Sequence, residues 1–130
     1  MKIVIDTSAI IAVIANEPNK KRIIEVSTGC ELIAPSSVHW EIANAFSAMF
    51  KQKRISLENS IKCVEKYKKI PIQFYEVDLV RSLEFSNEFG IYAYDSFLIT
   101  CAKSFNIPLL TLDKNLSSKA IEAGIKSLEI

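Results

Sequence analysis

The sequence predicts an α/β fold, a three-layer α/β/α sandwich built on a central, mostly parallel sheet. Short apolar runs alternate along the chain with longer segments whose apolar residues recur at helical spacing. Apart from residues 72–77, which alternate, the strands are apolar runs rather than strict alternations, which is typical of parallel strands buried on both faces. No repeat, linker or low-complexity stretch divides the 130 residues. We therefore expect one domain over residues 1–130, long enough to bury a core without cross-links.

Each predicted strand is a short run that a polar residue or a proline bounds. The first run stops at Asp6, the second stops at Pro35, and a later one begins after Pro108. Enrichment in Ile, Val and Leu favours strands over helices in runs of this length. The predicted strands are residues 3–5, 31–34, 72–77, 109–111 and 127–130.

The segments between these strands carry helix start and stop signals. Thr7 or Ser8 caps the first helix, and Asp78 caps a later one. Gly90 directly follows a predicted helix and Gly29 lies two residues beyond another, where a left-handed backbone conformation is common. The predicted helices are residues 9–15, 20–27, 38–53, 56–69, 79–89, 96–105 and 115–123.

Composition excludes several classes of protein. Lys and Arg total 16 against 15 Asp and Glu, so any contact with nucleic acid must come from local patches rather than a global positive field. The apolar run from Ala9 to Ala15 is too short to span a bilayer, and the first residues lack the plan of a signal peptide. Three widely spaced cysteines argue against disulfides or a zinc site. We expect a cytoplasmic protein with no membrane partner.

Four acidic residues occupy positions that are expensive for a negative charge. Asp6 and Asp113 follow predicted strands, Glu41 lies on a long helix with apolar neighbours, and Asp95 opens an apolar helix. In open parallel sheets, sites form beyond the carboxyl ends of the strands. Each acid also has a simple structural explanation: Asp95 and Asp113 could be helix caps, and Asp6 could merely end a strand.

The four acids together favour a bound divalent cation. Carboxylates that lie close together repel one another unless a cation sits between them. A set of oxygen ligands selects Mg²⁺ or Mn²⁺ over zinc. Such an ion holds a phosphodiester and activates a water, so the residues predict metal-assisted phosphoryl chemistry, either nuclease or phosphatase.

Four motifs in order carry a resemblance to the PIN domain family. The order and spacing are similar to those of small toxins of the VapC type, over essentially the whole chain. The motifs are Ile3-Val-Ile-Asp-Thr-Ser-Ala9, Glu41-Ile-Ala-Asn44, Tyr94-Asp-Ser96 and Leu110-Thr-Leu-Asp-Lys-Asn-Leu116.

The resemblance implies a Mg²⁺- or Mn²⁺-dependent endoribonuclease that leaves a 5′-phosphate and a 3′-hydroxyl. Its acidic metal-binding and catalytic set would be Asp6, Glu41, Asp95 and Asp113. The side chains that would support this set are Thr7 or Ser8, Thr111 and Asn44. The resemblance also implies a homodimer and a small antitoxin partner whose arginine or lysine reaches the acids.

Several alternatives stay open. The basic cluster (Lys51, Lys53 and Arg54) ends the helix that carries Glu41, and it is either a solvated face or a contact for RNA phosphates. Tyr92 and Tyr94 flank Asp95 and either stack on a base or pack within the protein. The chain could be an RNA-processing PIN nuclease without an antitoxin, or a non-catalytic flavodoxin-like interaction module whose acids are caps.

Overall fold

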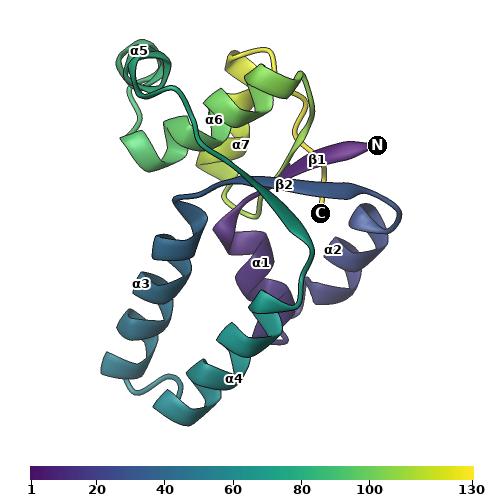
Figure 1. The fold of residues 1–130 in the computed structure, drawn as a ribbon, viewed down its shortest axis with the longest axis vertical. Helices are drawn as coiled ribbons and strands as arrows, with labels where there is room; N and C mark the ends of the chain where they lie inside the picture. The colour runs from purple at the N-terminus through teal and green to yellow at the C-terminus, as the bar shows by residue number, and fades with distance from the viewer.

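Four parallel strands form the central sheet of the computed structural model, which describes all 130 residues. The strands run in the order β3-β2-β1-β4, and each neighbouring pair is parallel. The predicted α/β class with a parallel sheet is therefore confirmed (Figure 1). The strands are β1 (Lys2–Ile5), β2 (Glu31–Pro35), β3 (Ile72–Tyr75) and β4 (Leu109–Leu110).

Seven helices cover the two faces of this sheet. Figure 1 shows α1 to α4 on one side of it and α5 to α7 on the other. The two faces account for two separate hydrophobic clusters, so the arrangement has three layers. The helices are α1 (Thr7–Ile14), α2 (Lys20–Ser27), α3 (Val38–Lys51), α4 (Leu57–Lys68), α5 (Leu79–Phe89), α6 (Ala93–Phe105) and α7 (Lys114–Glu122).

The apolar runs of the strands fill both clusters. In β1, Ile3 and Ile5 belong to the cluster under α1 to α4, whereas Val4 belongs to the cluster under α5 to α7. Successive side chains of a strand point to opposite faces, so a continuous apolar run is what a sheet covered on both sides requires. None of the helices is long and apolar enough to cross a membrane.

The strand order changes direction at β1. The chain proceeds from β1 outward through β2 to β3, and then returns past β1 to place β4 on its other side. Val4 pairs with Leu109 and Ile5 pairs with Leu110, so the carboxyl ends of β1 and β4 lie next to each other. A parallel sheet opens a crevice for ligands at such a reversal, and this one begins at Asp6 and Thr111.

The predicted last strand over residues 127–130 is wrong, and another strand is shorter than predicted. Ser127 forms only an isolated bridge with Leu109, because β4 has two residues and offers a fifth strand little to pair with. The strand predicted to reach Val77 ends at Tyr75, which pairs with Pro35. After Pro35 the chain leaves β2 and turns toward α3, so residues 76 and 77 have no neighbouring strand with which to pair.

Candidate active site

Asp6 is the most enclosed of the four acids. It ends β1 and lies at the N-cap position of α1, but its side chain does not cap that helix. Instead, Asp6 Oδ2 accepts hydrogen bonds from Ser8 Oγ at 2.8 Å and from Thr111 Oγ1 at 2.6 Å. The residue is 6% exposed. Hydroxyl donors stabilise the ionised form of a buried carboxylate and fix its orientation.

The same hydroxyls join the ends of β1 and β4. Ser8 Oγ accepts from the backbone N–H of Leu112 at 3.0 Å, and Thr111 Oγ1 accepts from the N–H of Asp113 at 3.0 Å. The two hydroxyl oxygens are 3.3 Å apart. Each therefore bridges the Asp6 carboxylate to the loop that follows β4, which sets the position of Asp113 relative to Asp6.

Glu41 lies in the first turn of α3 and faces the same crevice from the neighbouring element. Thr7 Oγ1 donates to Glu41 Oε2 at 3.1 Å, whereas Glu41 Oε1 is buried and has no hydrogen-bond partner. Burial, together with the negative charges of Asp6 and Asp95, raises the pKa of Glu41 from its ordinary value of 4.5 to about 7. A buried acceptor without a donor is unfavourable, and a cation would relieve it.

Asp95 lies in the first turn of α6, whose N-cap position is taken by Tyr92. The capping role considered for Asp95 is therefore wrong, because the helix begins at Ala93, two residues earlier than its carboxylate. Burial raises the pKa of Asp95, and the charges of Asp113 and Asp6 raise it further. The acids thus influence one another electrostatically across the crevice.

Asp113 combines a structural role with its place at the site. It is the N-cap of α7, where its Oδ1 accepts from the N–H groups of Asn115 at 2.9 Å and Leu116 at 3.1 Å. The cap explanation therefore holds for this acid. Its charge nevertheless reaches Asp95, and the cap occupies only one of the two carboxylate oxygens.

The four acids offer only oxygen ligands, which suit the hard divalent ion that the sequence predicts. No three His, Cys, Asp or Glu side chains converge into a ready-made metal site. Mg²⁺ commonly takes only one or two carboxylates and keeps several waters, so a tight cage is not required. The unpartnered Oε1 of Glu41 and the raised pKa values of Glu41 and Asp95 fit a position where a cation would offset the charges. The residues fit an ion held partly through water.

A pocket of about 560 Å³ opens beside Glu41, and we refer to it as the acidic pocket. Asn44, one turn along α3 from Glu41, is exposed and lies in its lining; its role in supporting the acids stays a prediction. Trp40 and Tyr94 complete the rim, and Trp40 was missed by the sequence reasoning. The sequence feature that could have indicated a place for Trp40 at the site was its position directly before Glu41. The lining residues are Thr7, Trp40, Glu41, Asn44, Ala45 and Tyr94.

The basic cluster is not brought to the acids. Lys51 ends α3, ten residues after Glu41, which corresponds to roughly 15 Å along a helix axis. Lys53 and Arg54 lie in the turn beyond, and all three side chains are exposed. A role in contacting RNA phosphates stays a prediction, and it would apply to nucleotides remote from the acids.

Comparisons with known proteins agree with this architecture. PAE2754 from Pyrobaculum aerophilum superposes with a TM-score of 0.75 at 20% identity, over 98% of this chain and 83% of that chain. VapBC2 from Rickettsia felis, bound to a DNA fragment from its promoter, gives 0.67 at 14% identity over 98% of each chain. FitAcB from Neisseria gonorrhoeae gives 0.59 at 14% identity, over 98% of this chain and 96% of that chain.

At these identities the structural likenesses establish the fold alone, and no curated protein matches the sequence. The model of the PIN domain family matches residues 3–122. That match begins in β1 and ends with α7, so it includes all four acids and the crevice between them. The chain belongs to the PIN domain family.

Proposed function

We propose that this protein is a Mg²⁺- or Mn²⁺-dependent endoribonuclease that hydrolyses RNA phosphodiester bonds, and that it is the toxin of a toxin–antitoxin pair. The observation that carries the proposal concerns the Glu41 carboxylate. Its Oε1 is buried without a hydrogen-bond partner, and the negative charges of Asp6 and Asp95 repel it. Asp113 in turn acts electrostatically on Asp95, so the mutual repulsion of the four acids supports a cation among them. Membership of the PIN domain family supports a nuclease.

The chain's own residues would prepare this site for catalysis. Thr111 and Ser8 hold Asp6 Oδ2 from two sides, so the carboxylate needs little reorganisation when an ion binds. Thr7 holds Glu41 Oε2 and leaves Oε1 for the ion. A bound divalent ion would supply a Lewis acid for the phosphate and lower the pKa of the attacking water. Asp95 and Asp113 would complete the acidic set.

An antitoxin partner is proposed from two kinds of support. One structural relative is VapBC2 from Rickettsia felis, which was crystallised on a fragment of its promoter. In addition, carboxylates that repel one another electrostatically, as Glu41, Asp6 and Asp95 do, are a favourable target for an arginine or lysine from another protein. We also propose that the nuclease works as a homodimer in the cytoplasm.

The test is cleavage of a mixed cellular RNA pool by purified protein, with Mg²⁺, Mn²⁺ or EDTA. We expect cleavage by the wild type with either metal and none with EDTA. Asp95→Asn should be inactive. Asp78→Asn is the matched control, because Asp78 caps α5, asparagine caps as well as aspartate does, and this residue is not one of the four acids.

Equal cleavage by wild type and Asp95→Asn would indicate a contaminating nuclease. If neither protein cleaved the RNA, the catalytic proposal would fall and an interaction module would be favoured. The two enzymatic alternatives are separated by gene neighbourhood, because a toxin should have a small antitoxin reading frame directly upstream, and by co-expression with the product of such a reading frame. A toxin should be inhibited by that protein, whereas an RNA-processing nuclease without an antitoxin should not.

A further inference from the structure

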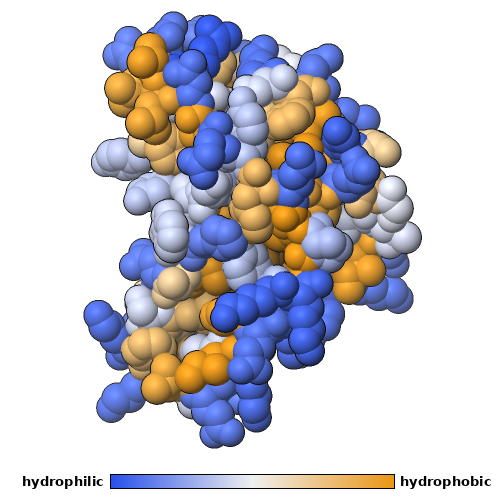
Figure 2. Space-filling model, in the orientation of Figure 1, coloured by the Kyte–Doolittle hydropathy of each residue, from blue (hydrophilic) through white to orange (hydrophobic).

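Two large aromatic side chains are exposed at the mouth of the crevice. Trp40 is 68% exposed and Tyr94 is 54% exposed. Each directly precedes one of the acids in the sequence, Trp40 before Glu41 on α3 and Tyr94 before Asp95 on α6. The starts of these two helices lie near each other in Figure 1. In Figure 2 the surface between α5 and the upper end of α3 is pale rather than deep blue, in keeping with weakly polar aromatic side chains.

Trp40 and Tyr94 form a wall shared by two pockets. On one side is the acidic pocket, with Glu41 and Asn44. On the other side is a second pocket of about 370 Å³, which we call the aromatic pocket. Its size falls within the usual range for small ligands, roughly 300–1,000 Å³. It is lined by Pro35, Ser36, Ser37, Trp40, Tyr75, Glu76, Val77, Leu79, Tyr94 and Phe97.

The aromatic pocket contains a polar group that lacks a partner. Ser37 Oγ is buried and makes no hydrogen bond, although Ser37 precedes α3 at the position where a side chain usually caps the helix. Glu76 accepts a hydrogen bond from Ser36 Oγ at 2.5 Å, which uses one of its two oxygens. The second oxygen of Glu76 therefore remains as an acceptor for a ligand, beside the aromatic and apolar side chains of the pocket.

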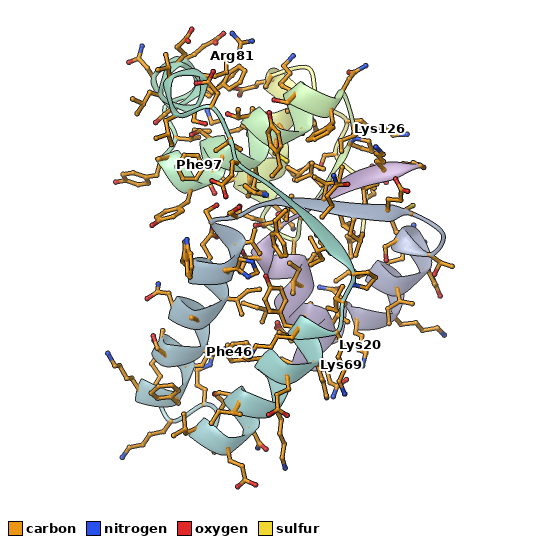
Figure 3. The ribbon with its side chains drawn as sticks, viewed as in Figure 1. Lys20, Phe46, Lys69, Arg81, Phe97 and Lys126 are labelled. Carbon is orange, nitrogen blue, oxygen red and sulfur yellow. The ribbon has the colours of Figure 1, made fainter.

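The wall itself is held in place. The ring of Tyr94 packs edge-on against Phe97, with centroids 5.8 Å apart and planes at 88°. Figure 3 labels Phe97 near the start of α6, close to the upper end of α3. Trp40 is tilted against His39 at 5.9 Å. The contact with Phe97 orients the Tyr94 ring, while much of the surface of both Tyr94 and Trp40 stays uncovered.

We propose that the aromatic pocket binds the base of an unpaired RNA nucleotide next to the scissile phosphate, by stacking on Trp40 and Tyr94. This inference rests on the proposed nuclease function. A phosphate is repelled by Glu76 and has no cation in the aromatic pocket, whereas an uncharged base stacks on aromatic rings and donates N–H groups to a carboxylate. The scissile phosphate then occupies the acidic pocket on the other side of the wall, where the divalent ion of the proposed nuclease would offset the charge of Glu41. Bases inside a duplex cannot reach such a wall, so the substrate is single-stranded.

The chain provides its own reporter, because Trp40 is the only tryptophan. The experiment titrates the Asp95→Asn protein, in Mg²⁺, with a mixed-sequence single-stranded oligoribonucleotide, so that the RNA stays intact. We expect saturable quenching of Trp40 fluorescence. The same strand annealed to its complement, and a ribose-phosphate oligomer without bases, should not quench.

Two tyrosine variants in this background separate stacking from nonspecific effects. Tyr94→Ala should weaken binding by about tenfold or more, as expected for one lost stacking partner. Tyr92→Ala is the matched control, because Tyr92 is 87% exposed and lines neither pocket, and it should bind as tightly as its parent. Anisotropy of labelled RNA gives the same comparison for Trp40→Ala, which has lost the reporter.

The outcomes distinguish this inference from the proposed function. Quenching without cleavage by the wild type would retain the base-binding pocket and overturn the nuclease. Cleavage by the wild type without quenching, or equal affinities for Tyr94→Ala and Tyr92→Ala, would overturn the base-binding pocket and leave the nuclease intact. In the latter case the exposed aromatic wall would be a docking surface for a protein.

Discussion

Replacing Glu41 with glutamine should make the metal-free protein more stable at high pH. The folded protein holds a proton on Glu41 more tightly than the unfolded chain does, because its pKa is raised from 4.5 to about 7. Proton linkage then requires the stability of the wild type to fall as pH rises between these two values. Glutamine cannot ionise, so the variant lacks this loss.

The size of the effect follows from the raised pKa. With about 1.4 kcal/mol for each tenfold change, the penalty at pH about 8 is at most about 3.5 kcal/mol. Glu41 is partly exposed, so solvent screening reduces the penalty to about 1.5 kcal/mol. For a chain of this length that corresponds to about 5 °C in melting temperature.

The assay is thermal unfolding in EDTA, followed by circular dichroism from pH about 5 to about 8, across the window set by the two pKa values. The melting temperature of Glu41→Gln minus that of wild type should rise by about 4 °C across this range. Burial of the glutamine amide could also shift the melting temperature of the variant, but by the same amount at every pH. Such a constant difference does not affect the change with pH. Glu65→Gln is the control, because Glu65 is an exposed glutamate on α4, and its curve should follow the wild type.

Parallel curves for wild type and Glu41→Gln would refute the reasoning, because they would mean that Glu41 does not titrate differently in the folded state. Saturating Mg²⁺ should reverse the order at pH about 8, since a ligand stabilises whichever protein binds it. If Mg²⁺ raised the two melting temperatures equally, Glu41 would have no part in holding the ion.

Three further predictions concern the neighbours of Glu41 and the far end of its helix. Thr111→Val removes the hydroxyl that donates to Asp6 and accepts from the N–H of Asp113. The free energy of unfolding, measured in urea, should fall by about 1–3 kcal/mol. Thr111→Ser should restore most of this loss. Asp113→Asn should keep the cap of α7 and its stability while lowering metal-dependent cleavage, whereas Asp113→Ala should also lose about 1 kcal/mol of stability. If Lys51, Lys53 and Arg54 all contact phosphates, replacing the three with glutamine should reduce the slope of log binding constant against log salt concentration by about 2 for single-stranded RNA. An unchanged slope would mean that the basic cluster is a solvated face.

The central sheet could be predicted because its strands are buried on both faces. Runs such as Ile3 to Ile5 have apolar side chains in both directions, and only a strand within a covered parallel sheet needs that pattern. In residues 127–130, Leu128 and Ile130 alternate with polar residues in a way that is compatible with a strand, yet only one bridge forms. The sequence cannot reveal that β4 ends after two residues. The number of residues that pair depends on the neighbouring strand as well as on the apolar residues of β4.

The candidate site was predictable to different degrees. Asp6 and Thr111 could be placed together because parallel strands end at one edge. The contact between Thr7 and Glu41 depends on how α3 packs beside α1, which the spacing of residues along one helix does not determine. For the same reason, nothing in the sequence indicates that Trp40 and Tyr94 share a wall between two pockets. Roles in catalysis for the acids stay predictions until the variants are measured.

The bond between Thr111 and Asp6 also bears on when the site can exist during synthesis. Its two residues are 105 positions apart, and chains emerge from the ribosome N-terminus first. A nascent chain can assemble β1, β2 and β3 with their helices while one edge of β1 is still open. Asp6 then lacks one of its two hydroxyl donors, and Asp113 has not been made. The acidic crevice is completed only when the final fifth of the chain emerges, so a growing chain does not carry a finished nuclease centre beside the ribosome's own RNA.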